Sequence, residues 1–234
     1  MSPIRKLAIA AGAFFLFSDV VSIAAVLLYG SVLTSAGYIV GSGSETRVLL
    51  GAFLEVLLAF SLVGTAVALY PVIRRQHEGI ALGYVGLRTL EAGIIAIGVL
   101  PILAVVTLRQ AGIAGTDAAT LTTVGRALVS IHNWTVLIGP DFTSGLNTVL
   151  LAYLLYRSGL VPRWIPVVGL VGGPLVFAVA IAVLFGVIAQ ISALAILPAL
   201  PELVWELSLA TYLIVKGFRP SAITALYSPG QEAG

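Results

Sequence analysis

The chain has 234 residues, of which 59% are hydrophobic and only 9% are charged, with 12 basic and 10 acidic side chains. Soluble domains carry charges at roughly a quarter of their positions, and so few charges cannot cover a surface that faces water. The composition excludes a cytosolic enzyme, a nucleic-acid-binding protein and a disordered chain. It indicates that the lipid bilayer is the solvent.

Six long apolar stretches follow one another, each near or above the ~20 residues that a helix needs to cross a bilayer. They cover residues 7–34, 48–73, 80–108, 125–156, 164–188 and 194–217. The fourth is one long bent helix or two pieces, because Gly139-Pro140 interrupts it and proline kinks a helix. We expect an all-α fold, a polytopic membrane bundle of six transmembrane helices, with the fourth kinked at Gly139-Pro140. Residues 1–219 form its single domain, and residues 220–234 form a short disordered tail.

The basic residues predict the orientation, because cytoplasmic loops of membrane proteins are enriched in Lys and Arg. One set of alternating segments holds eight of them: Arg5, Lys6, Arg74, Arg75, Arg157, Arg163, Lys216 and Arg219. The other set holds only Arg47, Arg109 and Arg126. Both termini are therefore expected in the cytoplasm. A seventh crossing made at Gly139-Pro140 would move the later loops to the opposite side and remove this bias.

Two longer connections on the outer side, residues 35–47 and 109–123, are rich in Gly, Ser, Thr and Ala, which is typical of surface loops. Asp117 lies in the second of them. It either caps a short helix that leads into the fourth span or is a solvated loop acid.

Eight acidic, basic or histidine side chains lie within the predicted spans away from their terminal two residues, where a charge costs a few kcal/mol and tends to face the bundle interior. They are Asp19, Glu55, Arg88, Glu91, His132, Asp141, Glu202 and Glu206. Even if the one Arg and the one His are both cationic, at least four of the six carboxyls lack a counter-charge. Those four must be protonated, hydrated in a cavity or neutralised by a bound cation. We expect a polar pocket that opens outward, with Arg88 beneath it.

Helical spacing indicates which of these side chains share a face. Tyr84, Arg88 and Glu91 stand at i, i+4 and i+7, so they lie on one stripe of a helix. Glu202 and Glu206 stand at i and i+4. Asp141, Ser144 and Thr148 form a further stripe. His132 and Asp141 are nine residues apart, on opposite faces of a straight helix, so only a kink would bring them together.

Several of these residues also have a purely structural interpretation. Arg88 and Glu91 could form an ion pair that only joins helices. Glu202 follows Pro201 at a helix start, where an acid suits the helix dipole. His132, with Asn133 and Trp134 beside it, could form a hydrogen-bonding cluster at the outer interface. Gly79 with Gly83, and Gly169 with Gly173, are spacings that let helices approach closely and could support a homo-oligomer.

Six runs of residues carry a resemblance to a known family. They are Gly64–Pro71, Glu78–Tyr84 leading into Arg88–Glu91, His132–Thr135 with Gly139-Pro140, Tyr153–Arg163, Pro201–Ser208 and Lys216–Arg219. In this order they resemble the bacterial membrane proteins grouped as domain-of-unknown-function family 4386. The resemblance implies a multi-helix protein of the bacterial inner membrane, without an assigned reaction or ligand.

The chain departs from the family at two positions. Asn133 stands where members often have Asp, and Asp141 where they have a small residue. The resemblance therefore points to Arg88, Glu91, His132, Glu202 and Glu206, rather than to Asp141, as the shared functional groups.

Three classes of function fit these observations. The first is a small transporter, channel or receptor-like binder whose acidic pocket takes protons, a metal cation or an organic amine. The second is a structural or accessory protein whose polar residues only hold helices together. The third, an intramembrane enzyme, is disfavoured because the chain has no His-Glu-x-x-His motif, no second intramembrane His and no recognisable nucleophile. No catalytic residue, cofactor or metal ligand is assigned.

Overall fold

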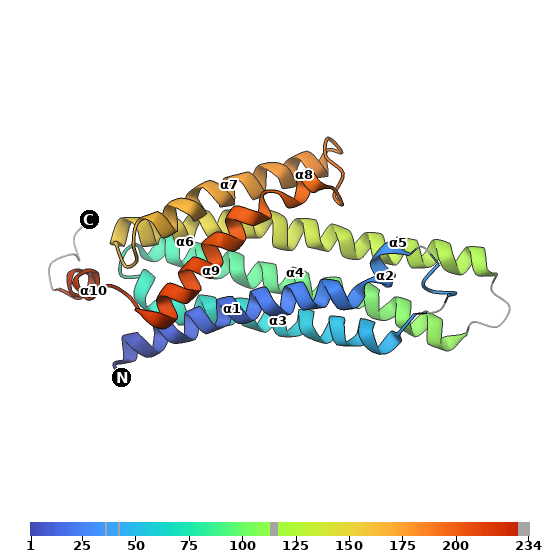
Figure 1. Ribbon diagram of the computed structural model, residues 1–234, viewed down its shortest axis with the longest axis horizontal. Coiled ribbons are helices and arrows are strands. Elements are labelled where there is room, and N and C mark those ends of the chain that lie inside the picture. Colours follow the sequence, from blue (N-terminus) through green and yellow to red (C-terminus); the bar gives the residue numbers. More distant parts are fainter. Residues whose placement is uncertain (36, 42, 113–116, 229–234) are drawn as a thin grey trace.

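The computed structural model describes residues 1–35, 37–41, 43–112 and 117–228, and over these residues it contains helices and no strand (Figure 1). The helices are α1 (Pro3–Tyr29), α2 (Ser31–Thr34), α3 (Glu45–Ile73), α4 (Glu78–Ala111), α5 (Ala118–Val136), the π-helix η1 (Leu137–Thr143), α6 (Ser144–Ser158), α7 (Trp164–Leu184), α8 (Ala193–Ile196), α9 (Ala199–Val215) and α10 (Pro220–Tyr227).

Five helical segments are long and apolar enough to cross a membrane: α1, α3, α4, α7 and the segment Ala193–Val215, which contains α8 and α9. They coincide with five of the six predicted spans, so the expectation of an all-helical membrane protein is confirmed. The predicted fourth span is a helical run through α5, η1 and α6. Gly139 and Pro140 lie in its π-helical part. A π-helical turn accommodates a residue that cannot donate a backbone hydrogen bond.

Helix starts follow the short polar side chains of the sequence. Ser2 and Ser44 accept hydrogen bonds from the backbone N–H groups of the first turns of α1 and α3. At α5, the Asp117 carboxylate accepts from Thr120 N at 2.9 Å and from Thr120 Oγ1 at 2.7 Å. These bonds lower the pKa of Asp117 from its ordinary 3.8. The capping interpretation of Asp117 is confirmed, although the helix that it starts has 19 residues and is not short.

Six helices form a closed ring, in the order α1, α3, α4, α6, α7 and α9, because each contacts the next and α9 returns to α1. The start of α1 and α10 lie at the same end of the molecule (Figure 1). At this end the ring is filled with apolar side chains. Phe15, Leu69, Tyr84, Leu155 and Trp205 are fully buried there. Polar side chains occupy the ring interior beyond this core.

Two glycines of α7 are buried in close contacts with other helices of the same chain. A Cβ atom on Gly173 would lie 2.7 Å from the backbone oxygen of Gly145 on α6, and one on Gly169 would lie 2.8 Å from the Trp205 ring on α9. The expectation that Gly169 and Gly173 support a homo-oligomer is therefore wrong for this face, because their surface is already buried by α6 and α9. For Gly79 and Gly83 it stays a prediction.

The predicted disordered tail is wrong for residues 220–227, which form α10. Pro220 suits the first position of a helix. The segment is held to the bundle because Phe218 and Ala222 are buried, Arg219 N donates to Leu160 O at 2.9 Å, and Tyr227 OH donates to Pro71 O at 3.4 Å. Residues 229–234 of the predicted tail lie outside the described residues.

Candidate functional site

A cavity of about 480 Å³ lies inside the helix ring. Seven of the eight ionisable residues singled out in the sequence line it: Asp19, Glu55, Arg88, Glu91, Asp141, Glu202 and Glu206. They lie on α1, α3, α4, η1 and α9, so five separate helical segments place ionisable side chains in one cavity. His132 does not line the cavity and lies beside Glu55 instead.

Arg88 stands at the base of this acidic group and is only 2% exposed. Its Nη1 donates to Glu91 Oε2 at 3.2 Å, and its Nη2 donates to Glu206 Oε1 at 3.0 Å. The first pair follows from i, i+3 spacing on α4, whereas the second joins α4 to α9. The guanidinium also lies 5.4 Å from the centre of the Phe15 ring, a cation–π contact with α1.

Glu91 has a second donor that the sequence analysis missed. Asn147 Nδ2 donates to Glu91 Oε2 at 2.7 Å, and both side chains are buried. Asn147 is an amide inside an apolar stretch, which was the available signal, since a polar group in hydrocarbon needs a hydrogen-bond partner. α6 thereby joins the network that links α4 to α9.

Glu202 is held by the stripe that the spacing predicted on α6. Thr148 Oγ1 donates to Glu202 Oε1, and Ser144 Oγ lies 3.4 Å from the same oxygen. The other carboxyl oxygen, Oε2, is buried without a hydrogen-bond partner in the described structure. Asp141, the third member of the stripe, lines the cavity, and its carboxyl has no hydrogen bond to any described side chain or backbone group.

Glu55 belongs to a smaller cluster at the wall of the cavity. Tyr29 OH donates to Glu55 Oε2 at 2.6 Å, and His132 Nε2 lies 3.9 Å from Glu55 Oε1. The His132 ring is fixed by a 2.8 Å hydrogen bond between Nδ1 and Gly98 O and by an edge contact with the Tyr29 ring. The structure therefore brings His132 to Glu55, and Tyr29 was missed because an aromatic residue near a helix end is typical of the membrane interface.

The charges around the cavity do not balance. Arg88 is the one basic residue among those that line it, and Glu91 and Glu206 are its partners. Asp19, Asp141 and Glu202 have no basic side chain within 4.0 Å in the described part of the chain. Asp19 Oδ2, like Glu202 Oε2, is buried without a hydrogen-bond partner there. Such groups are costly unless a proton, water or ligand satisfies them.

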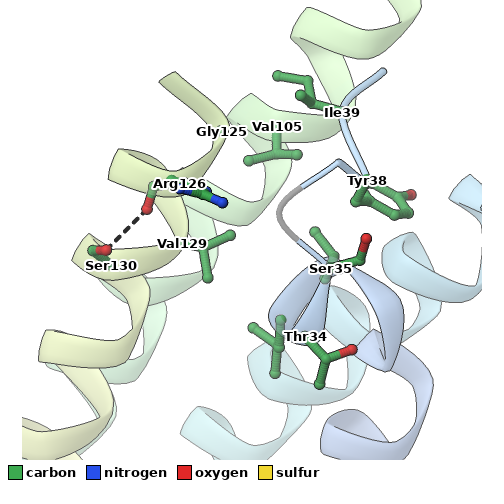
Figure 2. A pocket seen from close by; sticks show the side chains of 11 residues that line it. Thr34, Ser35, Tyr38, Ile39, Val105, Gly125, Arg126, Val129 and Ser130 are labelled. Carbon is green, nitrogen blue, oxygen red and sulfur yellow. Dashed lines mark hydrogen bonds between the residues drawn. The ribbon is translucent and has the colours of Figure 1, made fainter. Parts of the chain in front are cut away.

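A second cavity of about 280 Å³ lies between α2, the loop after it, and the facing turns of α4 and α5 (Figure 2). Tyr38, Val105 and Arg126 are among its lining residues, and Ser130 Oγ donates to Arg126 O at 2.9 Å. None of the eight predicted site residues lines it. Across the described ranges, no group of three or more His, Asp or Glu side chains is arranged to hold a metal ion.

The long apolar helices define the class of the molecule, an all-helical integral membrane protein of unassigned activity. The chain belongs to the family described as Domain of unknown function (DUF4386), whose model matches residues 10–217. The resemblance found in the sequence is therefore confirmed. Comparison with curated proteins and with solved structures gave no match.

Proposed function

We propose that this protein binds a small organic cation, an amine, in the acidic cavity. The observation that carries the proposal is the charge of the lining, six carboxyls against one guanidinium in a space of about 480 Å³. Arg88 forms ion pairs with Glu91 and Glu206 but offsets only one of their two charges, and Glu55 is hydrogen-bonded by Tyr29. Asp19, Asp141 and Glu202 remain for a ligand. An ammonium group donates up to three hydrogen bonds and would supply the missing positive charge.

The size of the cavity favours an amine over a proton or a bare metal ion. Cavities of roughly 300–1,000 Å³ are typical of small-molecule sites, which are mostly apolar with a few converging polar groups. This cavity has both properties, because Leu58, Ile95 and Val176 line it beside the carboxyls. Protons and metal cations are tested in the same experiment as competing ligands.

We further propose six membrane crossings, with α5, η1 and α6 together as the fourth and a bend at Gly139-Pro140. Both termini lie in the cytoplasm and the membrane is the bacterial inner membrane. Support comes from the distribution of the basic residues, because eight lie in the segments at the end of the bundle that holds the start of α1 and α10, and three lie in the segments at the opposite end. Arg88 lies about 15 Å along α4 from Glu78, and Glu55 about 27 Å along α3 from Ile73, at 1.5 Å per residue. The acids therefore extend from Arg88 toward the outer side, which supports a cavity that opens in the outer half of the membrane.

Ligand-dependent thermal stability tests the proposed binding. The midpoint of thermal unfolding of the purified protein is measured from pH 4 to 9 with short alkylamines and with divalent cations. A ligand that prefers the folded state raises the midpoint with its concentration. We expect amines to raise the midpoint in a saturable way, with an apparent affinity at least tenfold lower in Glu202→Gln. This variant keeps the side-chain shape and removes a charge. Glu78→Gln, an exposed acid outside the cavity, is the control.

A scaffold is the second candidate function, and one specific observation favours it. Arg88 joins α4 to α9, and Asn147 of α6 bonds the same Glu91. A scaffold predicts that Glu202→Gln melts earlier at every pH and that no amine or metal ion shifts the wild-type midpoint. Under the binding proposal, removing an unmatched charge leaves the midpoint of the free protein equal or higher.

A further inference from the structure

The cavity has an open side between α1 and the segment formed by α8 and α9. The two helices α1 and α9 cross near the end that holds the start of α1 and then diverge toward α8 (Figure 1). Gly12 marks the crossing, because a Cβ atom there would lie 2.6 Å from the backbone oxygen of Ala210.

Four side chains form the rim of this opening. Ile23 and Val26 of α1, Ile196 of α8 and Leu200 of α9 line the cavity, and each side chain is also between 53% and 60% exposed. A residue that is both inside the cavity and on the surface lies where the two meet. The cavity therefore opens sideways, through the wall of the helix ring.

The rim faces the hydrocarbon of the bilayer rather than water. All four rim side chains are aliphatic, and residues 164–201, which supply α7, α8 and the start of α9, contain no Asp, Glu, Lys, Arg or His. Ile23 lies about 30 Å along α1 from Pro3, at 1.5 Å per residue, so the rim is at the depth of the outer leaflet in the proposed orientation. An opening of this composition admits an apolar chain.

Buried acids stand directly behind the rim. Asp19 is one helical turn before Ile23, and Glu202 lies two residues after Leu200. Both are 8% exposed, line the cavity, and have one carboxyl oxygen without a hydrogen-bond partner in the described structure. An apolar rim alone would suit any lipid chain, and acids alone would suit any cation. Together they select a molecule that has a cationic head and an apolar tail.

We propose that the ligand is an amphiphilic amine that enters from the bilayer between α1 and α8–α9, with its ammonium group at Asp19 and Glu202 and its chain in the opening. This proposal rests on the amine-binding function above and specifies the ligand and its route. The ammonium group of a membrane lipid and that of a free long-chain amine share this chemistry. The experiment distinguishes them by including both.

The test uses the full chain in lipid nanodiscs of phosphatidylglycerol, which carries no amine. Thermal midpoints are measured with alkylammonium ions of four to twelve carbons, with phosphatidylethanolamine mixed into the disc, and with alkyl carboxylates of matched length. The rim variants Leu200→Trp and Ile23→Trp narrow the opening from either side. Val67→Trp, on an exposed α3 position outside the cavity, is the matched control for folding and lipid contact.

The expected result is an apparent affinity for alkylammonium ions that rises with chain length, up to about fourfold per methylene, with no shift from the carboxylates. In the two rim variants, the apparent affinity for the twelve-carbon amine should fall at least tenfold, whereas in Val67→Trp it should not. A rise with phosphatidylethanolamine would identify a lipid as the source, and a rise with the free amines alone would identify a soluble amphiphile.

Two results would overturn the proposal in different ways. If four-carbon and twelve-carbon amines bind equally and both rim variants behave as wild type, the proposal of lateral entry is wrong while the proposal of amine binding stands. If amines of every length leave the midpoint unchanged, amine binding fails and the inference fails with it.

Discussion

Arg88 Nη2 and Glu206 Oε1 are 3.0 Å apart although the residues are separated by 118 positions in the chain. The same guanidinium bonds Glu91 through Nη1. One buried cation therefore forms ion pairs with two buried acids from two helices and offsets the charge of one of them. This relationship fixes the position of α9 relative to α4 and places the inner limit of the cavity.

Removing this cation should be severely destabilising. Arg88→Met leaves Glu91 and Glu206 buried without their charge partner, and breaking such a pair costs about 3–5 kcal/mol of unfolding free energy. The double variant Arg88→Met/Glu206→Gln should recover part of this loss, because one uncompensated charge is removed. Denaturation of the purified variants in mixed micelles measures both effects. A stability of Arg88→Met equal to that of the wild type would show that the ion pairs do not hold α9 in place.

The close contact between α6 and α7 should tolerate no additional methyl group. A Cβ atom on Gly173 would meet the backbone oxygen of Gly145 at 2.7 Å, and backbone cannot move aside as a flexible side chain can. We expect Gly173→Ala to lower the unfolding free energy by about 1–3 kcal/mol. Gly86→Ala is the matched control, because a Cβ atom there meets nothing within 4 Å. Since Ala favours helix, the control should gain about 0.5–1 kcal/mol, and an equal loss in both would contradict the packing explanation.

Arg5 should stabilise the C-terminal end of α9. Its guanidinium donates to the carbonyl oxygens of Leu213, Ile214 and Val215 at 2.9, 2.5 and 3.1 Å. These are carbonyls of the last helical turn, where a cation also interacts favourably with the helix dipole.

Arg5→Ala should therefore cost about 1.5–3 kcal/mol, the range for hydrogen bonds to a charged group. Hydrogen exchange of the α9 amides should show the loss concentrated in its last turns. The neighbouring exposed Lys6→Ala should have little effect. Equal exchange in the two variants would show that net charge near the terminus, and not the cap, is what matters.

The cap of α5 should depend on pH. Hydrogen bonds from Thr120 lower the pKa of Asp117 below its ordinary 3.8. A folded-state pKa below the unfolded value means that the stabilisation is present above pH 3.8 and is lost as the pH falls through the lower folded value. The Thr120 amide resonance should follow this titration with a midpoint below 3.8.

In Asp117→Asn, which still accepts the hydrogen bond from Thr120 N, the titration of the Thr120 amide should disappear while the helix start is kept. A midpoint at or above 3.8 in the wild type would mean that the carboxylate does not hold the cap in solution.

Local spacing in the sequence correctly placed several neighbours. Arg88 with Glu91, and Ser144 with Thr148, share helix faces because residues three or four apart always do so on an α-helix. By contrast, the contact of Tyr29 with Glu55 and the contact of Asn147 with Glu91 depend on how separate helices are rotated and crossed. That rotation is set by side-chain packing over the whole bundle, which periodicity within one helix does not contain.

The tail and the glycines show the same limit. Residues 220–227 have a composition that does not by itself require order, and α10 is held because Phe218 and Ala222 find buried positions against other segments. Gly169 and Gly173 could have served a second copy of the chain or another helix. Only the folded bundle shows that α6 and α9 cover them.

The sequence alone determined that the chain is a helical membrane protein and that its ionisable residues turn inward, because hydrocarbon penalises both exposed backbone and exposed charge wherever they occur along the chain. The tertiary structure alone decided which acids pair with Arg88 and which line the cavity without a basic partner among the described residues. Those outcomes depend on distances between helices that are far apart in the chain, and the angle at which α9 crosses α1 is a property of their packing and not of either segment.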